Sequence, residues 1–249
     1  HKKYRKNFGK THFRSYITPI RFETVSRRNC NPVIYEEWDM AEKIRVGVWG
    51  LGRAGNGMHF SELAMYPDQF EVVAGCDIDI ERREAAMKKK HGIHVYDNSA
   101  DFLKDQEVEL VTIATRSPDH VKHAIEAAEA GKYVMVEKPI ACTLADALEL
   151  KKASEKFPGK IFIRHNRRFE PAFVHIREII KSGKLGEIFE IKLCRHNFQW
   201  RADWQTLLDF GGGQLLNWGP HIVDHALQFL ESPVREIWSD LKLVAAKGD

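Results

Sequence analysis

Cysteine is scarce in this chain, and no two cysteines stand close together. The four cysteines are Cys30, Cys76, Cys142 and Cys194, and none belongs to a Cys-x-x-Cys pair. Neither a zinc site nor a disulfide framework is therefore expected, and no metal is predicted. Isolated cysteines are typical of a reducing compartment, so the sequence predicts a cytoplasmic protein.

Long apolar runs are also missing, and charge is nearly balanced beyond residue 39. No stretch approaches the roughly 18 apolar residues that span a bilayer, so no membrane partner is expected. Residues 1–39 hold nine Lys or Arg and four Asp or Glu, which leaves 29 basic and 31 acidic residues of the totals of 38 and 35. Because a nucleic-acid-binding surface needs an excess of positive charge, no nucleic-acid partner is expected.

Residues 1–39 differ from the rest of the chain. They lack helical or strand periodicity and begin without methionine. Ser26-Arg27-Arg28 is similar to a twin-arginine signal, but no apolar segment follows it, and a basic, acid-poor transit peptide is the other alternative. We favour Met40 as the true start, with residues 1–39 as an unstructured or non-native extension outside the fold.

From Met40 onward the sequence predicts a regular alternation of strands and helices. Hydrophobic content of 43% and charged content of 29% are typical of a globular protein. Short apolar runs predict strands at 44–49, 70–76, 93–96, 108–114, 133–136 and 160–164, and longer segments bounded by Gly or Pro predict helices at 55–66, 80–90, 99–104, 119–130 and 144–157. Repeated strand–helix units with short turns predict a parallel, doubly wound sheet.

A glycine-rich loop follows the first expected strand. In this context the first glycine of G-x-G-x-x-G permits a tight turn, the second lets the backbone approach a pyrophosphate, and the third lets the helix pack on the strand. The helix N-terminus then presents N–H groups to the phosphates. The loop therefore predicts dinucleotide binding by Gly50, Leu51, Gly52, Arg53, Ala54 and Gly55.

An acidic residue ends the second expected strand. Asp77 lies 22 residues after Gly55. An acid there suits the adenosine ribose hydroxyls and repels a 2′-phosphate, which favours NAD over NADP. Arg82 and Arg83 lie nearby and weaken this preference, so NADP stays as the alternative. The other interpretation of Asp77 is an N-cap for the helix at 80–90.

Glu137 and Lys138 directly follow the strand expected at 133–136, and Pro139 follows them. Ligands of open parallel sheets bind at the carboxyl ends of the strands, so this charged pair is placed for chemistry. A lysine in a water-poor cleft can lose part of its proton affinity and steer protons on a substrate. The alternative is two solvated charges beside a turn proline.

Two further polar residues flank the end of the strand expected at 108–114. Thr115 and His120 lie on the same side of the predicted sheet as the glycine loop. We predict that both, together with Glu137 and Lys138, contact the cofactor. For His120 a position on the face of the following helix is an equal alternative.

The second half of the chain has a different pattern. Helices are expected at 171–181 and 214–230, strands at 187–196 and 234–245, and a loop over a cleft at 197–210. Asn217, His221 and Asp224 are spaced to share one face of the 214–230 helix, whose other faces are apolar. A polar stripe on so apolar a helix predicts a cavity or a partner facing it, although a buried histidine is as often a core residue.

From Lys43 to its end, the sequence resembles the Gfo/Idh/MocA oxidoreductases, the family of glucose–fructose oxidoreductase and inositol dehydrogenase. Several motifs in a fixed order carry the resemblance. They are Gly50-x-Gly52-x-x-Gly55, Glu137-Lys138-Pro139, Arg167-Arg168-Phe169, Gly183-Lys184-Leu185-Gly186, and Gly211-Gly212-Gly213 leading to His221-x-x-Asp224.

The resemblance implies an α/β fold of two domains. An N-terminal, doubly wound Rossmann domain that binds NAD or NADP is expected over 40–160. The first part of a C-terminal α/β domain with a mostly antiparallel open sheet, used for substrate and oligomer contacts, is expected over 161–249. Family members continue through further strands, so a C-terminally truncated chain is predicted, and a homo-oligomer is expected at full length.

The resemblance also implies hydride transfer between nicotinamide and a hydroxyl-bearing carbon of a sugar, cyclitol or derivative. Lys138 matches the family's active-site lysine, and His221 matches its histidine acid/base. Asn217 stands where polyol dehydrogenases commonly have an aspartate, and an amide can hydrogen-bond a hydroxyl but cannot share a proton. The catalytic set is thus Lys138, His221 and Asn217, and the candidates for contacts to this small-molecule substrate are Arg167, Arg201, Trp204 and Asp224.

Two alternative functions fit the same residues. One is a glycosidase that oxidises and re-reduces its sugar with bound NAD, which would release no net NADH. The other is a non-catalytic, dinucleotide-sensing regulator, because a fold does not fix a function. Retention of Lys138 and His221 favours the enzyme.

Overall fold

The computed structural model of the chain describes residues 43–196 and 200–242. These residues fall into two compact units, one ending at Ile163 and the other beginning at Arg164. Among the helices in these ranges, none is both long and apolar enough to cross a lipid bilayer. The extension predicted for residues 1–39 lies outside the described residues.

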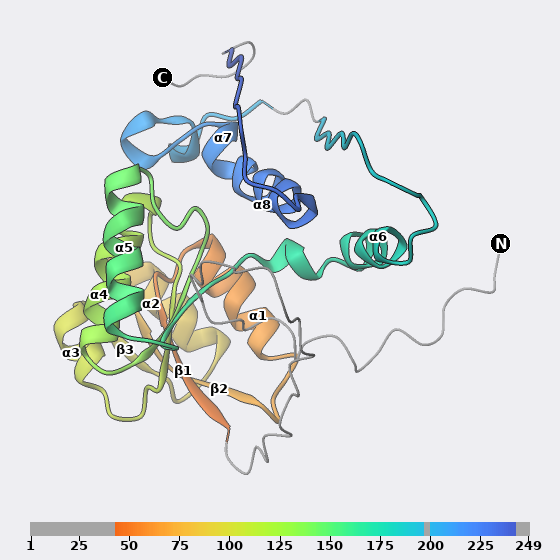
Figure 1. Cartoon of the computed structure of the whole chain (residues 1–249). Coiled ribbons are helices and arrows are strands. Elements are labelled where there is room, and N and C mark those ends of the chain that lie inside the picture. The colour runs from red at the N-terminus through yellow and green to blue at the C-terminus, as the bar shows by residue number, and fades with distance from the viewer. Residues whose placement is uncertain (1–42, 197–199, 243–249) are drawn as a thin grey trace. The chain divides into compact units, whose positions relative to one another are not determined.

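The first unit contains a six-stranded parallel sheet with the order β3-β2-β1-β4-β5-β6. The chain runs from β1 through β2 to β3 at one edge of the sheet and from β4 through β5 to β6 at the other, which confirms the predicted doubly wound sheet. Figure 1 labels the strands of the first half, β1, β2 and β3. Ligands of such sheets bind where the strand order reverses, here between β1 and β4. The strands are β1 (Ile44–Trp49), β2 (Phe70–Cys76), β3 (His94–Tyr96), β4 (Leu110–Ile113), β5 (Tyr133–Val136) and β6 (Ile161–Ile163).

The helices of the first unit lie close to their predicted positions. Residues 55–66, predicted as one helix, instead form a π-helical segment followed by a short α-helix. The helical segments are η1 (Arg53–His59), α1 (Phe60–Leu63), α2 (Ile80–Lys89), α3 (Ser99–Lys104), η2 (Ser117–Asp119), α4 (His120–Glu129) and α5 (Leu144–Lys156). Buried residues of α3, α4 and α5, including Phe102, Ala124 and Leu150, pack in one core with the strands.

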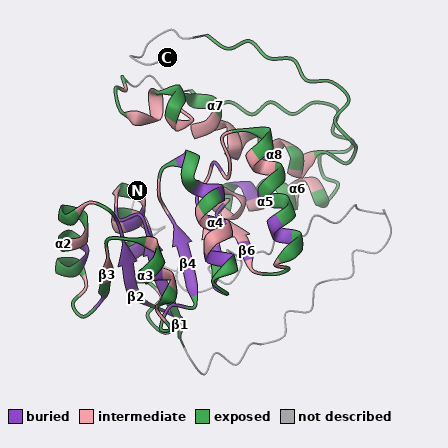
Figure 2. Ribbon diagram, turned by 90° about the vertical axis from the view of Figure 1, so that its left-hand side faces the viewer, coloured by how far each residue is buried: buried purple, intermediate pink, exposed green. Residues whose placement is uncertain are grey.

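The central strands β1, β2 and β4 are mostly buried, whereas the edge strand β3 is not, and the outer sides of the helices are exposed (Figure 2). Val48 in β1, Val111 in β4 and Val134 in β5 have no exposed surface. Helices on both faces of a parallel sheet explain why its strands are continuous apolar runs rather than alternating patterns. The carboxyl ends of β1, β2, β4 and β5 are therefore held in place by a packed core that excludes water.

The second unit is helical. Its longer helices are α6 (Pro171–Lys181) and α8 (Gly219–Phe229), and its short segments are η3 (Asn166–Phe169), η4 (Trp204–Thr206), η5 (Leu208–Phe210) and α7 (Gln214–Asn217). The ring of Phe173 in α6 stacks on that of His225 in α8, with centroids 3.8 Å apart. The Phe173 ring also lies 5.2 Å from that of Phe229 in α8. These aromatic contacts join the two longer helices.

The C-terminal sheet expected from the sequence is not found in the described residues. No strand forms in 187–196 or 234–242, so both strand predictions are wrong there, and 243–245 lies outside the described residues. All strands of the described sheet are parallel and belong to the first unit. A strand forms only when a neighbour accepts its backbone hydrogen bonds, and the alternating residues 187–196 pair with no described segment.

Candidate functional site

The glycine loop is shaped by two close approaches. Gly50 has a φ of +94°, a left-handed conformation that glycine adopts without strain. A Cβ on Gly55 would lie 1.8 Å from the carbonyl oxygen of Gly50, so only glycine fits there. The N–H of Gly50 donates to the Cys76 carbonyl at 2.8 Å, which holds the loop against the end of β2. Ala54 follows in η1.

Asp77 is buried at the end of β2 and bonds to the glycine loop. Its Oδ2 accepts from the N–H of Leu51 at 2.8 Å, and its Oδ1 accepts from the N–H of Asp79 at 3.0 Å. Asp79, rather than Asp77, is the N-cap of α2, where its side chain accepts from the N–H of Glu81. The N-cap interpretation of Asp77 is therefore wrong, and its carboxylate is fixed beside the loop.

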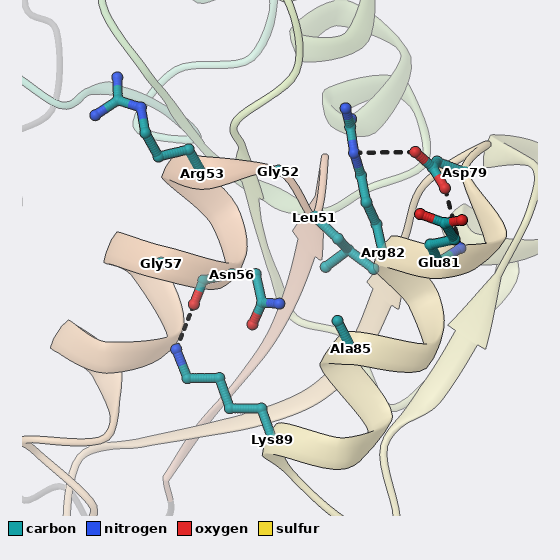
Figure 3. A pocket seen from close by; sticks show the side chains of 10 residues that line it. All are labelled: Leu51, Gly52, Arg53, Asn56, Gly57, Asp79, Glu81, Arg82, Ala85 and Lys89. Carbon is teal, nitrogen blue, oxygen red and sulfur yellow. Dashed lines mark hydrogen bonds and ion pairs between the residues drawn. The ribbon is translucent and has the colours of Figure 1, made fainter.

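A hollow of about 540 Å³ opens between η1 and α2 (Figure 3). The side chain of Arg82, on α2, lies 3.3 Å from that of Asp79 (Figure 3). It also lies 3.5 Å from the carboxylate of Asp77. A Cβ on Gly52 would meet only this guanidinium, so backbone is open to a ligand at that position. The hollow is lined by Leu51, Gly52, Arg53, Asn56, Gly57, Asp79, Glu81, Arg82, Ala85 and Lys89.

These features fit a dinucleotide. Gly50 and Gly55 permit the tight turn, and the backbone at Gly52 is open to a pyrophosphate. The fixed carboxylate of Asp77 stands beside the loop, where a ribose diol would need an acceptor. Arg82 and Lys89 add positive charge to the same hollow, and Lys89 donates to the Asn56 carbonyl.

Glu137 lies buried beside a histidine that sequence reasoning missed. His59, the last residue of η1, places its Nε2 2.9 Å from Oε1 of Glu137, and the side chains are 1% and 9% exposed. The other carboxylate oxygen accepts from the backbone N–H of Lys138 at 3.2 Å. The pair therefore ties the helix after the glycine loop to the turn that carries Lys138. The pattern held a signal, since His59 lies one turn after Gly55 on the face that packs on the sheet.

Lys138 is half-buried at the carboxyl end of β5. The residue after it, Pro139, offers its carbonyl to Nδ1 of His120 at 2.7 Å. The Nε2 of His120 lies 3.2 Å from the carbonyl of Thr115, and burial lowers the pKa of this histidine. A neutral imidazole has one N–H, and the shorter contact assigns it to Pro139. His120 thus links the ends of β4 and β5, and its predicted contact with the cofactor stays a prediction.

Thr115 faces another unpredicted histidine. Its Oγ1 lies 3.0 Å from Nδ1 of His123, and the His123 ring stacks on Trp49 at 4.0 Å. Burial lowers the pKa of His123 to about 4. This neutral cluster supports the carboxyl ends of β1 and β4, where the sheet order reverses.

In the second unit, the polar stripe predicted on one helix is divided. Asn217 ends α7, whereas His221 and Asp224 are buried in α8, and the chain bends between them at Trp218. Pro220 lies in the first turn of α8, where its missing N–H costs nothing. Asn217 and His221 therefore do not share a continuous helix face.

Asp224 forms a two-pronged ion pair with Arg168. Nε of Arg168 donates to Oδ2 at 2.8 Å and its Nη2 donates to Oδ1 at 2.5 Å. These hydrogen bonds raise the pKa of Arg168. Both carboxylate oxygens are engaged by protein, so Asp224 holds η3 against α8 in this structure.

The remaining predicted substrate residues also contact protein. Arg201 pairs with Asp203 at 2.7 Å, and the ring of Trp204 meets that of Phe210 at 6.2 Å. Arg167 forms an ion pair with Glu170.

Arg167 also stacks on an aromatic residue beside the predicted acid/base. Its guanidinium carbon lies 4.3 Å from the ring centre of Trp218, and the Trp218 ring lies 5.8 Å from that of His221. The ring of His165 lies 6.2 Å from that of His221. His221 is thus a buried residue with two aromatic neighbours, and a guanidinium lies close to one of them.

A group of three side chains near the start of β3 could share a metal ion. His94, Asp105 and Glu107 bring ligand atoms within 4.8 Å of one another. Asp105 already accepts from the hydroxyl of Tyr96 at 3.0 Å and the N–H of Glu107 at 2.9 Å. These hydrogen bonds explain why the three side chains lie together without a metal ion. The expectation of no metal stays a prediction.

Comparisons with known proteins agree with this geometry. The NAD-binding Rossmann-fold model of the GFO/IDH/MocA oxidoreductase family matches residues 44–165, and that of its C-terminal domain matches residues 173–248. The Salmonella typhimurium inositol 2-dehydrogenase is 36% identical over 167 residues, covering 66% of this chain and 49% of the relative. The Bacillus subtilis scyllo-inositol 2-dehydrogenase (NADP(+)) IolW is 27% identical over 194 residues, covering 77% and 53%.

Solved structures show the same fold. The WlbA dehydrogenase from Bordetella pertussis, in complex with NADH and UDP-GlcNAcA, is similar with a TM-score of 0.65 at 27% identity, covering 78% of this chain and 56% of that one. The chain spans about half the length of the curated relatives that it matches. The first unit is an NAD-binding Rossmann domain, as the family match, the glycine loop, the carboxylate of Asp77 and the order of the strands together show. With both family models matched in order along the sequence, the chain belongs to the Gfo/Idh/MocA family of oxidoreductases.

Proposed function

We propose that this chain belongs to an NAD-dependent dehydrogenase that transfers a hydride between nicotinamide and a hydroxyl-bearing carbon of a sugar, cyclitol or derivative. The observation that carries the proposal is the glycine loop bonded to Asp77 through the Leu51 N–H. Relatives named inositol dehydrogenases and a similar structure containing NADH support the reaction class. When bound, the nicotinamide would supply the hydride acceptor.

The residues of this chain would handle the proton. His221, buried in α8, would accept the proton of the substrate hydroxyl as general base. Lys138 would donate a hydrogen bond to the developing alkoxide oxygen and lower its energy. Asn217 would hydrogen-bond a neighbouring hydroxyl without sharing a proton. The Glu137 carboxylate supports this turn, because it accepts from the Lys138 N–H.

The cofactor preference is proposed as NAD over NADP. Asp77 is buried, and its carboxylate would repel a 2′-phosphate at the ribose. Arg82 reduces that repulsion, since it lies 3.5 Å from the same carboxylate. The relative named as NADP-dependent makes the comparison of both cofactors necessary.

The first experiment is calorimetric titration of NAD⁺ and NADP⁺ into the chain. We expect binding of both, with NAD⁺ tighter. If neither cofactor binds, the oxidoreductase proposal fails.

The second experiment tests the chemistry. With NAD⁺ and a panel of cyclitols and sugars, we expect NADH release, and Lys138→Ala should lower turnover by at least about a hundredfold. Turnover within a few-fold of the unmodified chain would remove Lys138 from the mechanism. Light scattering of the same samples would test the expected homo-oligomer.

A further inference from the structure

Trp218 carries two guanidinium groups. The guanidinium carbon of Arg195 lies 3.7 Å from the ring centre of Trp218, and that of Arg167 lies 4.3 Å from it. Both distances are within the range of cation–π contacts. Trp218 is the N-cap of α8, and its ring centre lies 5.8 Å from that of His221, so both cations contact a ring that neighbours the proposed proton acceptor.

The cations of this unit differ in how they are neutralised. Arg167 pairs with Glu170, and Arg168 pairs with Asp224. Arg201 pairs with Asp203. Within the described parts of the chain, no carboxylate lies within ion-pair distance of Arg195, and its guanidinium contacts the Trp218 ring.

Stacking on an indole leaves a guanidinium able to bind an anion. A contact through the guanidinium carbon, 3.7 Å from the ring centre, does not use up the N–H donors at the edge of the group. This edge matches the two oxygens of a carboxylate or phosphate, which it binds through parallel hydrogen bonds. Arg195 is exposed, so this edge can receive a ligand from solvent. The Trp218 contact also limits side-chain motion, which reduces the entropy lost on binding.

We propose that Arg195, held on Trp218, binds an anionic group of the substrate, so that the substrate is an acidic hydroxy compound bearing a carboxylate or phosphate rather than a neutral polyol. This rests on the proposed dehydrogenase function, because it takes His221 as the group that meets the reacting hydroxyl. The anion would fix one end of the substrate while its hydroxyl lies at His221. Arg167 adds positive potential on the same indole, although Glu170 offsets much of it.

The test is calorimetric binding of D-glucuronate, D-glucose 6-phosphate and D-glucose to the chain saturated with NAD⁺. Glucuronate and glucose 6-phosphate separate a carboxylate from a phosphate, and glucose is their neutral counterpart. At least one acidic ligand should bind about tenfold or more tightly than glucose, the usual effect of a charge-assisted hydrogen bond. That difference should shrink with added salt.

Three variants connect the effect to Arg195. Arg195→Gln should remove the preference for the acidic ligand, and Arg195→Lys should retain only part of it, because lysine keeps the charge but lacks the planar fork. The matched control is Arg177→Gln, since Arg177 is also exposed and lies 5.9 Å from an aromatic ring of the same unit. This control should leave all affinities within about twofold.

Several results would overturn the proposal. These are equal affinity for acidic and neutral ligands, no measurable binding of either acidic ligand, or unchanged affinity in Arg195→Gln. NAD⁺ binding in the same samples separates this failure from failure of the dehydrogenase proposal. A chain that binds NAD⁺ normally and prefers glucose would keep the enzyme and discard the acidic substrate.

Discussion

The two units of this chain are ordered by different forces. In the first unit, parallel strands with wholly buried residues such as Val48 and Val134 fix the backbone that carries the glycine loop and Lys138. In the second, apolar residues such as Val223 and Leu227 are about half exposed, and ion pairs and ring stacks provide the specific contacts. The first unit is thus set by backbone packing, and the second by side-chain pairs.

The largest expected effect tests the backbone side of this comparison. Gly55→Ala would force a Cβ to within 1.8 Å of the Gly50 carbonyl. The loop must shift, so we expect loss of NAD⁺ binding and a fall in the free energy of unfolding of about 3 kcal/mol or more, at the upper end for overpacking. Urea denaturation and calorimetry measure both.

Gly57→Ala is the matched control. Gly57 is a helical glycine in η1, and a Cβ there would meet nothing within 4 Å. Its substitution should leave stability unchanged or raise it by about 0.5–1 kcal/mol, since alanine favours helix. Equal losses in the two variants would show that close packing of the loop is not what matters.

A second effect concerns the buried pair that supports Lys138. His59→Leu would leave one oxygen of the Glu137 carboxylate without its histidine partner, at a cost of about 1–3 kcal/mol in the free energy of unfolding. His59→Gln supplies an amide donor and should recover part of that loss. If leucine and glutamine behave alike in urea denaturation, the hydrogen bond is not what stabilises the turn.

The third effect tests the side-chain pairing of the second unit. Arg168→Met removes the partner of buried Asp224, and we expect a loss of about 1–2 kcal/mol, because Arg168 itself is partly solvated. Near-ultraviolet circular dichroism should show the change in the tryptophan signal while NAD⁺ affinity stays the same. Lys192→Met, which removes an exposed pair with Glu190, should cost less than about 0.5 kcal/mol. A similar loss in both variants would contradict a special role for Asp224.

The last effect is a pH dependence within the first unit. Burial lowers the pKa of His123 to about 4 from 6.5, so the unfolded chain binds a proton at higher pH than the folded chain does. The contribution of the neutral His123 to the free energy of unfolding is therefore fully present above pH 6.5 and is lost as the pH drops toward 4. His123→Gln should flatten this slope in thermal melts, whereas exposed His175→Gln should not. A slope that persists unchanged in His123→Gln would assign it to other groups, buried His120 first.

Local sequence patterns predicted much of the structure of the first unit. The apolar runs predicted the strands. Gly50, Gly55 and the acid 22 residues later predicted which end of the sheet binds the cofactor. Each of these features depends on a short stretch of chain or on a standard crossover connection. The same logic failed for 187–196, where alternation predicted a strand that found no partner among the described residues. Alternation of apolar and polar residues predicts which face of a strand is buried, but it does not show which other strand would pair with it.

By itself, the sequence determined the parallel, doubly wound sheet and the place of the glycine loop, since turn chemistry and apolar periodicity act over a few residues. Tertiary structure alone decided that His59 meets Glu137 across 78 positions of sequence and that Asp224 is taken up by Arg168 across 56. It also placed Arg195 on Trp218. Such pairs depend on where the chain returns in space, which no local pattern encodes.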